Sequence, residues 1–316
     1  MGRTRNRHRE RQLLACLACV LLALSTWQAG ATVWQAGHQA QAVWGGASSL
    51  QQAAQQLHSA QALLVRRSDG AVLFQRQADS PMYPASLTKI MTALVALETL
   101  PDLDTQVCLT PDIFPPLEEA SASLAGFSPG EWVTVRDLLY GCLLSSGAEC
   151  SVALARLSAG TEAAFVQKMN ERARQLGMAN THFTNACGLH DPDHVSTAHD
   201  LALLLDASLA NPTFRQIFTT WHYQASVTPQ HPEGLPLSST LADELPPEAL
   251  RSGVILGGKT GFTSQAGLCL ATLSCLGTDE YILITGSAPG NHATEQYNIT
   301  DACLLLNALS SVLVSG

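Results

Sequence analysis

Residues 84–100, PASLTKIMTALVALETL, combine an apolar pattern of helical spacing with a serine and a lysine at its start. We predict a helix over residues 86–100, because a proline precedes the pattern and its apolar positions are Ile90, Leu94 and Leu97. Ser86 and Lys89 are three residues apart, so they would lie on one helix face within side-chain reach. A serine becomes a good nucleophile beside a base, and a lysine is that base only where burial or a cation lowers its pKa far below about 10.4. The pair is a candidate nucleophile and base, although S-x-x-K alone also arises by chance on a capped surface helix.

Two further motifs follow in the chain. Lys259-Thr260-Gly261 comes after two glycines and, we expect, before a strand, so that a cation, a hydroxyl and unhindered backbone are presented together. Ser146-Gly147 stands at the end of an apolar helix predicted over residues 137–144. The order S-x-x-K, S-x-N, K-T-G is the signature of penicillin-recognising serine enzymes. Here the middle motif is Ser146-Gly147-Ala148, with alanine where asparagine is usual.

The segments around these motifs narrow the resemblance. Residues 84–93 are similar to the nucleophile segment of the serine-type D-alanyl-D-alanine carboxypeptidases, the low-molecular-weight penicillin-binding proteins. Further segments resemble that family in the same order: residues 137–155, 176–198 and 258–267. The resemblance covers about residues 60–312. It implies the β-lactamase/transpeptidase-like fold, an α+β domain with an antiparallel sheet flanked by helices and a helical region that contributes Ser146.

The resemblance also implies a reaction. Ser86 is expected to attack the carbonyl between the last two D-alanines of a peptidoglycan stem peptide and to form an acyl-enzyme. Lys89 is the expected general base, and Ser146 the expected proton relay to the leaving amine. Penicillin and other β-lactams are expected to acylate the same serine, and the resemblance implies no metal and no organic cofactor.

Substrate binding is expected on the third motif. Lys259 and Thr260 would hold the terminal carboxylate beside Gly261, and the charge of Lys259 would help to keep Lys89 neutral. The backbone N–H groups of Ser86 and Phe262 would form the oxyanion hole.

Three features depart from the family pattern. Ala148 lacks an amide that contacts the substrate backbone in relatives. Ser145 is an alternative to Ser146 as the relay, although the glycine that follows favours Ser146. Some relatives place an arginine after the penultimate strand to bind the carboxylate, whereas this chain has only His292 there, to which we assign no such role.

Three rival functions are weighed against this interpretation. A β-lactamase would carry an additional Glu in an E-x-x-L-N loop, which the sequence between Ser146 and Lys259 lacks. A zinc carboxypeptidase would need metal ligands, and one stretch is crowded with candidates, although such side chains commonly form turns and caps: His190, Asp191, Asp193, His194, His199 and Asp200. The non-enzyme alternative is a homologue that recognises cell-wall peptide without cleaving it. The departure from the family motif that favours this alternative is Ala148.

We expect Glu149, the next residue, to serve as a negative charge at the start of a helix.

The amino end is typical of an export signal. Five arginines precede residue 12, and residues 13–25 are an apolar run that is too short to span a membrane. Ala29-Gly30-Ala31 is a cleavage pattern, so residues 1–31 are predicted to be a signal peptide. The alternative is an uncleaved anchor, which would be the protein's only membrane contact. We therefore expect an exported protein that acts on the cell-wall side of the membrane.

The remainder is predicted to be a linker and one catalytic domain. Residues 32–59 are rich in Gln, Ala, Gly and Ser, so we interpret them as a linker, with structure from about Ala60 and a catalytic domain over 60–316. A hairpin is predicted around the turn at 68–70, and strands at 267–273 and 281–285. Further helices are predicted at 134–144, 150–157, 161–176, 197–209 and 299–314.

Composition excludes other classes. The 316 residues carry a net charge of −9, and without residues 1–31 they hold 12 basic against 25 acidic side chains, which argues against a nucleic-acid partner. Seven cysteines follow the signal, an odd number without C-x-x-C pairs, so we interpret them as small buried apolar residues with no functional role: Cys108, Cys142, Cys150, Cys187, Cys269, Cys275 and Cys303.

Overall fold

The computed structural model describes residues 47–242, 244–246 and 248–315. The predicted signal peptide, residues 1–31, lies outside the described residues. The predicted linker overlaps them, and there the prediction is wrong: residues 47–54 form helix α2 (Ala47–Ala54), which packs on the last helix, α10 (Tyr297–Ser315). Ser59 is fully buried, and its backbone N–H donates to Asp301 Oδ2 in α10 (2.6 Å). The folded unit therefore begins before Ala60.

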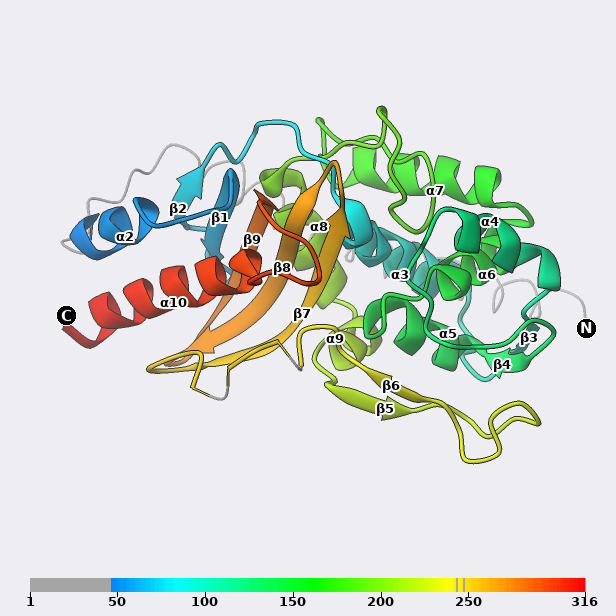
Figure 1. The fold of residues 1–316 in the computed structure, drawn as a ribbon. Helices are drawn as coiled ribbons and strands as arrows, with labels where there is room; N and C mark the ends of the chain where they lie inside the picture. The colour runs from blue at the N-terminus through cyan, green and yellow to red at the C-terminus, as the bar shows by residue number, and fades with distance from the viewer. Residues whose placement is uncertain (1–46, 243, 247, 316) are drawn as a thin grey trace, which may run out of the picture.

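The centre of the molecule is a five-stranded antiparallel sheet with the strand order β2-β1-β9-β8-β7 (Figure 1). It joins segments that are far apart in the sequence, because β1 (Gln61–Arg66) pairs with β9 (Asp279–Ala288). The remaining strands are β2 (Val72–Arg76), β7 (Val254–Thr263) and β8 (Gly267–Leu276). β7 is an edge strand, which leaves one side of its backbone open to the helical region.

Alternation along the strands produces two cores. Leu283 on β9 faces α2 and α10, whereas its neighbours Ile282 and Ile284 belong to the larger core shared with α3 (Thr88–Thr99) and α8 (Ala198–Leu209). The side chains of a strand point alternately to the two faces of a sheet, so each face is covered by its own helices. Figure 1 shows this sandwich, with α2 and α10 together on one face.

A helical region lies beside the sheet and packs around α3. Its other helices are α4 (Phe114–Glu119), α5 (Val135–Leu143), α6 (Ala148–Ala159), α7 (Glu162–Gln175) and α9 (Pro212–Phe218). Two short 3-10 helices, η1 (Ala85–Leu87) and η2 (Pro111–Ile113), precede α3 and α4. Thr134 begins α5 with a reciprocal capping box to Asp137, so the helix starts where the prediction over 134–144 placed it.

Two small antiparallel hairpins extend the helical region: β3 (Gln106–Cys108) with β4 (Trp132–Thr134), and β5 (His222–Gln224) with β6 (Pro236–Ser238). The second hairpin is tied to α5, since Tyr223 stacks on Tyr140 and donates to Asp137 Oδ1 (2.9 Å). The chain that leaves β6 runs directly to Thr240, beside β7.

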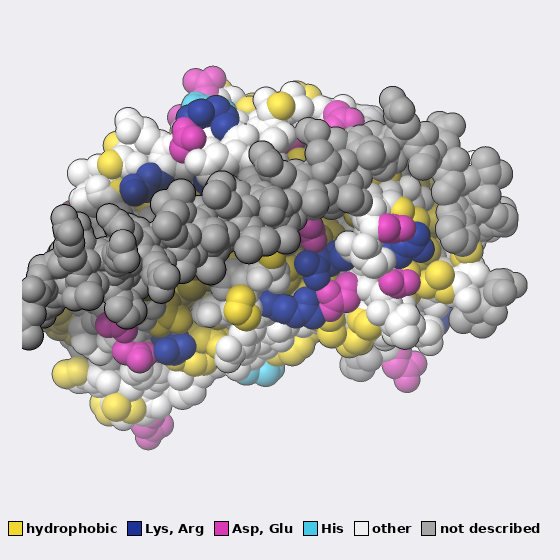
Figure 2. Space-filling view, turned by 180° about the vertical axis from the view of Figure 1, so that it is seen from behind, with side chains coloured by type: hydrophobic (Ala, Val, Ile, Leu, Met, Phe, Trp, Pro, Cys, Tyr) yellow, Lys and Arg dark blue, Asp and Glu magenta, His cyan; other side chains and the backbone are white. Residues whose placement is uncertain are grey.

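The predicted α+β fold and the predicted hairpin, helices and C-terminal strands are confirmed. One strand was not predicted: Lys259-Thr260-Gly261 lies inside β7, and the strand predicted after it is β8. No helix in the described ranges is long and apolar enough to cross a bilayer. Seen from behind, the described part of the surface carries basic side chains next to acidic ones (Figure 2).

Candidate active site

Ser86 lies in η1, two residues before α3 begins, and Lys89 lies in the first turn of α3. η1 begins at Ala85, whose φ of 47° is in the left-handed region that a non-glycine residue rarely occupies. Lys89 is 2% exposed, and its Nζ is 3.0 Å from Ser86 Oγ and 2.7 Å from the carbonyl oxygen of Cys187. The predicted nucleophile and base are therefore in hydrogen-bond contact.

Burial sets the protonation of this amine. Removal from water disfavours the ammonium form and lowers the pKa of Lys89 below its ordinary value of 10.5. A lower pKa favours the neutral amine, whose lone pair a general base requires. Burial of Lys89 therefore acts in the direction that a Ser-Lys nucleophile and base pair needs.

Ser146 faces the same centre from the loop between α5 and α6. Its φ of 59° turns the chain, and its Oγ accepts a hydrogen bond from Lys259 Nζ (2.9 Å). Ser145, the alternative relay, instead donates to the carbonyl oxygen of Ser238 (3.4 Å). The structure therefore brings Ser146, and not Ser145, to Lys259.

Lys259 lies in β7 with no exposed surface. Burial and repulsion from Lys89 both lower the pKa of Lys259 well below 10.5. Its Nζ also donates to the carbonyl oxygen of Thr260 (2.8 Å), and Thr260 Oγ1 lies 2.6 Å from Thr240 Oγ1. Two lysines and four hydroxyl groups therefore converge from four segments of the chain.

The strand approaches the nucleophile closely at Gly261. A Cβ added there would lie 3.1 Å from Ser86 N and 3.2 Å from Pro84 O, so glycine is what lets β7 reach the start of α3. The next residue, Phe262, stands beside the cleft with its ring edge against His292.

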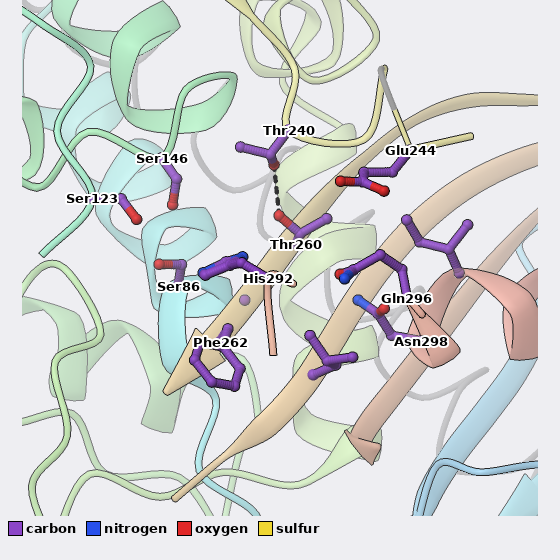
Figure 3. A pocket seen from close by; sticks show the side chains of 13 residues that line it. Ser86, Ser123, Ser146, Thr240, Glu244, Thr260, Phe262, His292, Gln296 and Asn298 are labelled. Atoms are coloured by element: carbon purple, nitrogen blue, oxygen red, sulfur yellow. Dashed lines mark hydrogen bonds between the residues drawn. The ribbon is translucent and has the colours of Figure 1, made fainter. Parts of the chain in front are cut away.

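These groups line one continuous cleft at the edge strand. Ser86, Ser146, Thr260 and Phe262 are part of its lining, and Figure 3 shows the hydroxyls of Ser86 and Ser146 directed into it. The remaining lining includes residues that sequence reasoning missed as site residues: Ser123, Thr240, Glu244, His292, Gln296 and Asn298. Among these only His292 carried a sequence signal, its place after the last strands, because the others reach the cleft through loops and the start of α10.

Comparisons with known proteins agree with this geometry. Residues 48–287 match the model of the peptidase S11 family, described as D-alanyl-D-alanine carboxypeptidase. The chain belongs to this family. The family consists of extracytoplasmic cell-wall enzymes that act on peptidoglycan, and its members include DD-carboxypeptidases and endopeptidases.

Individual relatives cover most of the described domain. The D-alanyl-D-alanine carboxypeptidase DacF of Bacillus subtilis is 33% identical over 231 residues, 72% of this chain and 57% of its own length. A D-alanyl-D-alanine endopeptidase of Pseudomonas aeruginosa is 33% identical over 244 residues, 75% of this chain and 74% of its own. The crystal structure of the Streptomyces K15 DD-transpeptidase superposes with a TM-score of 0.72 at 27% identity, covering 80% of this chain and 97% of that one. The chain thus spans little more than half the length of DacF.

Ala148, the S11 motif position that departs from the usual asparagine, begins α6 and is buried. Its backbone N–H donates to the carbonyl oxygen of Ser123 (2.8 Å). Glu149 follows in the first turn, as predicted for a helix-start charge, and its Oε1 accepts from the backbone N–H groups of Ala125 (2.7 Å) and Gly126 (3.1 Å). Burial raises the pKa of this carboxyl. The start of α6 therefore holds the loop that carries Ser123 into the cleft.

The six candidate zinc ligands serve separate structural roles in this family member. His194 is buried between Thr88 and Thr184, whereas His199 pairs with Asp79 (3.0 Å). No group of three or more potential ligands that could hold a metal ion occurs among the described residues.

All seven cysteines of the domain are free thiols in the described residues. Four are buried as predicted, and Cys108, Cys275 and Cys303 are partly exposed, which corrects the prediction for those three. Burial raises the pKa of the Cys142 and Cys187 thiols, so they are held in the neutral form beside Lys89.

Proposed function

We propose that this S11 peptidase is a D-alanyl-D-alanine carboxypeptidase that removes the terminal D-alanine of peptidoglycan stem peptides through an acyl-enzyme on Ser86. The observation that carries the proposal is the 3.0 Å contact between Ser86 Oγ and Lys89 Nζ, with Lys89 2% exposed. Such a contact places a nucleophile beside a base whose pKa is lowered by burial. The same activity in full-length relatives such as DacF supports the proposal.

In the proposed reaction Ser86 Oγ attacks the carbonyl carbon as Lys89 takes its proton. The backbone N–H groups of Ser86 and Phe262 stabilise the oxyanion, a role that the close approach of β7 at Gly261 supports. As the peptide C–N bond breaks, a proton passes through Ser146 to the leaving amine. Water then attacks the ester, and Lys89 receives and returns the proton.

The leaving D-alanine is proposed to be held at the edge strand. Thr260 Oγ1, paired with Thr240 Oγ1, donates to its carboxylate, and Lys259 adds a positive field behind them. The signal-like residues 1–31 support export of the protein, so that this reaction takes place on the cell-wall side of the membrane.

The test is the intact mass of the purified protein after a brief exposure to penicillin. We expect an adduct of one penicillin that maps to Ser86, together with release of D-alanine from a pentapeptide by the untreated protein. A folded protein without an adduct would contradict the proposal and favour a non-catalytic homologue that recognises cell-wall peptide.

A further inference from the structure

A second pocket adjoins the cleft at Ser86. This acyl-side pocket is lined in part by three segments of the chain: residues 120–123, 187–190 and 262–265. Thr260 lines the cleft and does not line this pocket. Because Thr260 is the proposed contact of the leaving carboxylate, the acyl-side pocket receives the part of the peptide that becomes the ester on Ser86.

Ser123 lies where the cleft and the acyl-side pocket meet. Like Ser86, it lines both of them. Its side chain is exposed, and within the described part of the chain its hydroxyl has no hydrogen-bond partner. Figure 3 shows this hydroxyl directed toward those of Ser86 and Ser146, on the side of them that is away from Thr260. The hydroxyl of Ser123 is therefore available to a ligand beside the nucleophile.

The backbone around Ser123 is held firmly. Its carbonyl oxygen accepts the N–H of Ala148 (2.8 Å), and Glu149 Oε1 accepts the N–H groups of the two residues that follow Leu124. A Cβ added at Gly147 would lie 2.7 Å from Ala125 Cβ, so this loop packs directly against the residue after Ser146. A donor that is already fixed in place loses little conformational freedom when a ligand binds.

The neighbouring position 148 offers the ligand no polar side chain. Ala148 is 1% exposed and contributes only a methyl group to the lining of the acyl-side pocket. Lys89, which also lines this pocket, is bonded to Ser86 Oγ and to the carbonyl oxygen of Cys187. Donation to the ligand beside Ser86 from this wall of the pocket therefore falls to Ser123.

The lining of the acyl-side pocket suits an uncharged part of a peptide. Among the described residues that line it, Lys89 is the only lysine, arginine, aspartate or glutamate, and it is buried. A mostly neutral wall with one placed donor binds a peptide backbone through its carbonyl oxygen.

We propose that Ser123 is a substrate-binding residue whose hydroxyl donates a hydrogen bond to the peptide carbonyl that precedes the acylated D-alanine. In this chain it takes the place of a polar side chain at position 148. The bond orients the stem peptide so that the scissile carbonyl faces Ser86 Oγ, and it persists in the acyl-enzyme because it lies on the acyl side. This inference rests on the proposed acyl-enzyme function.

The experiment compares two acylating probes that differ in this carbonyl. Benzylpenicillin has an acylamino group beside its β-lactam carbonyl, whereas 6-aminopenicillanic acid has the same bicyclic ring with a free amine instead. The measurement is the rate constant for acylation of the full chain, followed by intact mass. Ser123→Ala should slow benzylpenicillin about fivefold to tenfold and 6-aminopenicillanic acid less than about twofold, because only the first probe has the carbonyl that accepts from Ser123.

Two further variants show whether the hydroxyl itself is responsible. Ser123→Thr keeps a hydroxyl and should retain the rate with benzylpenicillin within about threefold. Ser128→Ala is the matched control, since Ser128 belongs to the same loop and lines neither the cleft nor the acyl-side pocket. It should change neither rate by more than about twofold.

An amide at position 148 tests the replacement directly. Ala148→Asn adds a donor beside Ser123, so in that background Ser123→Ala should slow benzylpenicillin less than about twofold. An undiminished loss, in a protein shown to be folded, would contradict the claim that Ser123 takes the place of a polar side chain at position 148.

The outcomes separate this inference from the proposed function. Adducts with equal slowing of both probes by Ser123→Ala, or with no slowing of either, would overturn the role of Ser123 and leave the acyl-enzyme standing. If the native protein forms no adduct, the acyl-enzyme proposal fails, and calorimetry with a stem pentapeptide ending in D-Ala-D-Ala then tests Ser123. Binding weakened about tenfold by Ser123→Ala supports the contact, and equal binding contradicts it.

Discussion

Lys259 Nζ lies 2.9 Å from Ser146 Oγ, although the two residues are separated by 113 positions in the sequence. One comes from the edge strand of the sheet and the other from a loop of the helical region. Lys89 and Ser86 meet at the same place on α3 and η1. The site thus exists only where segments far apart in the sequence meet, and the contribution of each residue can be tested by substitution.

Ser86→Ala should abolish acylation by a fluorescent penicillin, because the attacking oxygen is removed. Lys89→Ala should reduce it nearly as far, by about 1,000-fold or more, since a nucleophile and its base act as one unit. The Ser86→Ala/Lys89→Ala double variant should be no worse than Ser86→Ala alone. Additive losses would mean that the 3.0 Å contact is not catalytic.

Ser146→Ala should slow turnover about 100-fold, because the leaving amine loses its proton relay and Lys259 loses its acceptor. Ser145→Ala is the matched control one residue earlier, and it should leave the rate within about twofold. The measurement is release of D-alanine from a pentapeptide. If Ser145→Ala has the larger effect, the relay has been assigned to the wrong serine.

The acylation rate should fall as the pH is lowered. Burial lowers the pKa of Lys89, so less of its amine is protonated at a given pH than in a free lysine, and protonation at lower pH removes the lone pair. The rate constant for penicillin acylation, measured over roughly pH 5 to 9, should reach its plateau well below the ordinary lysine pKa. A rate that still rises up to the pKa of a free lysine would contradict a buried, neutral base.

His194 should make the fold sensitive to acid. Burial lowers its pKa from 6.5 to about 4, and its Nδ1 accepts the backbone N–H of Thr184 (3.1 Å), a bond that protonation removes. The unfolded chain binds this proton more readily, so the stabilisation is complete above about pH 6.5 and is lost as the pH falls towards 4. The loss is about 3 kcal/mol in the free energy of unfolding.

Urea unfolding at a series of pH values measures that slope. His194→Gln should flatten it, whereas His222→Gln, at an exposed position, should leave it in place. An unchanged slope in the His194 variant would assign the acid sensitivity to other groups.

Gly188→Ala should lower the acylation rate more than the strain of a positive φ alone would lower it. Gly188 has a φ of 84°, and a Cβ there would lie 1.9 Å from the carbonyl oxygen of Ala85, directly before the nucleophile. Ala85 would have to move to relieve this contact, and the resulting displacement of Ser86 is expected to slow acylation about 100-fold. Gly177→Ala is the control, because its φ of 78° is similar and the added Cβ meets nothing within 4 Å. Equal acylation rates in the two variants would show that the contact with Ala85 does not position Ser86.

The predictable parts of the fold are those with local patterns. Residues 86–100 carried both the helical spacing and the reactive pair, so α3, Ser86 and Lys89 followed from the sequence. The strand that contains Lys259 was missed because Gly257, Gly258 and Gly261 interrupt the usual strand pattern. Those glycines are required by close contacts, such as that of Gly257 with the Phe218 carbonyl oxygen, which appear only in three dimensions.

Other features depended on partners far along the chain. Helix α2 has a short, uncharged, Gln- and Ala-rich sequence that is typical of a linker, and its partner α10 comes some 250 positions later. Thr240 and Asn298 lie in segments with no motif, so nothing local indicated that they share a cleft with Ser86.

The left-handed backbone conformation of Ala85 destabilises the folded protein directly beside the nucleophile. A non-glycine residue at a φ of 47° costs roughly 1 to 2 kcal/mol, and the nucleophile comes next in the chain. A laboratory selection for heat resistance alone would therefore favour glycine at position 85, because it relieves the strain. Because the next residue is Ser86, thermostable variants of this chain should be selected on acylation and melting temperature together.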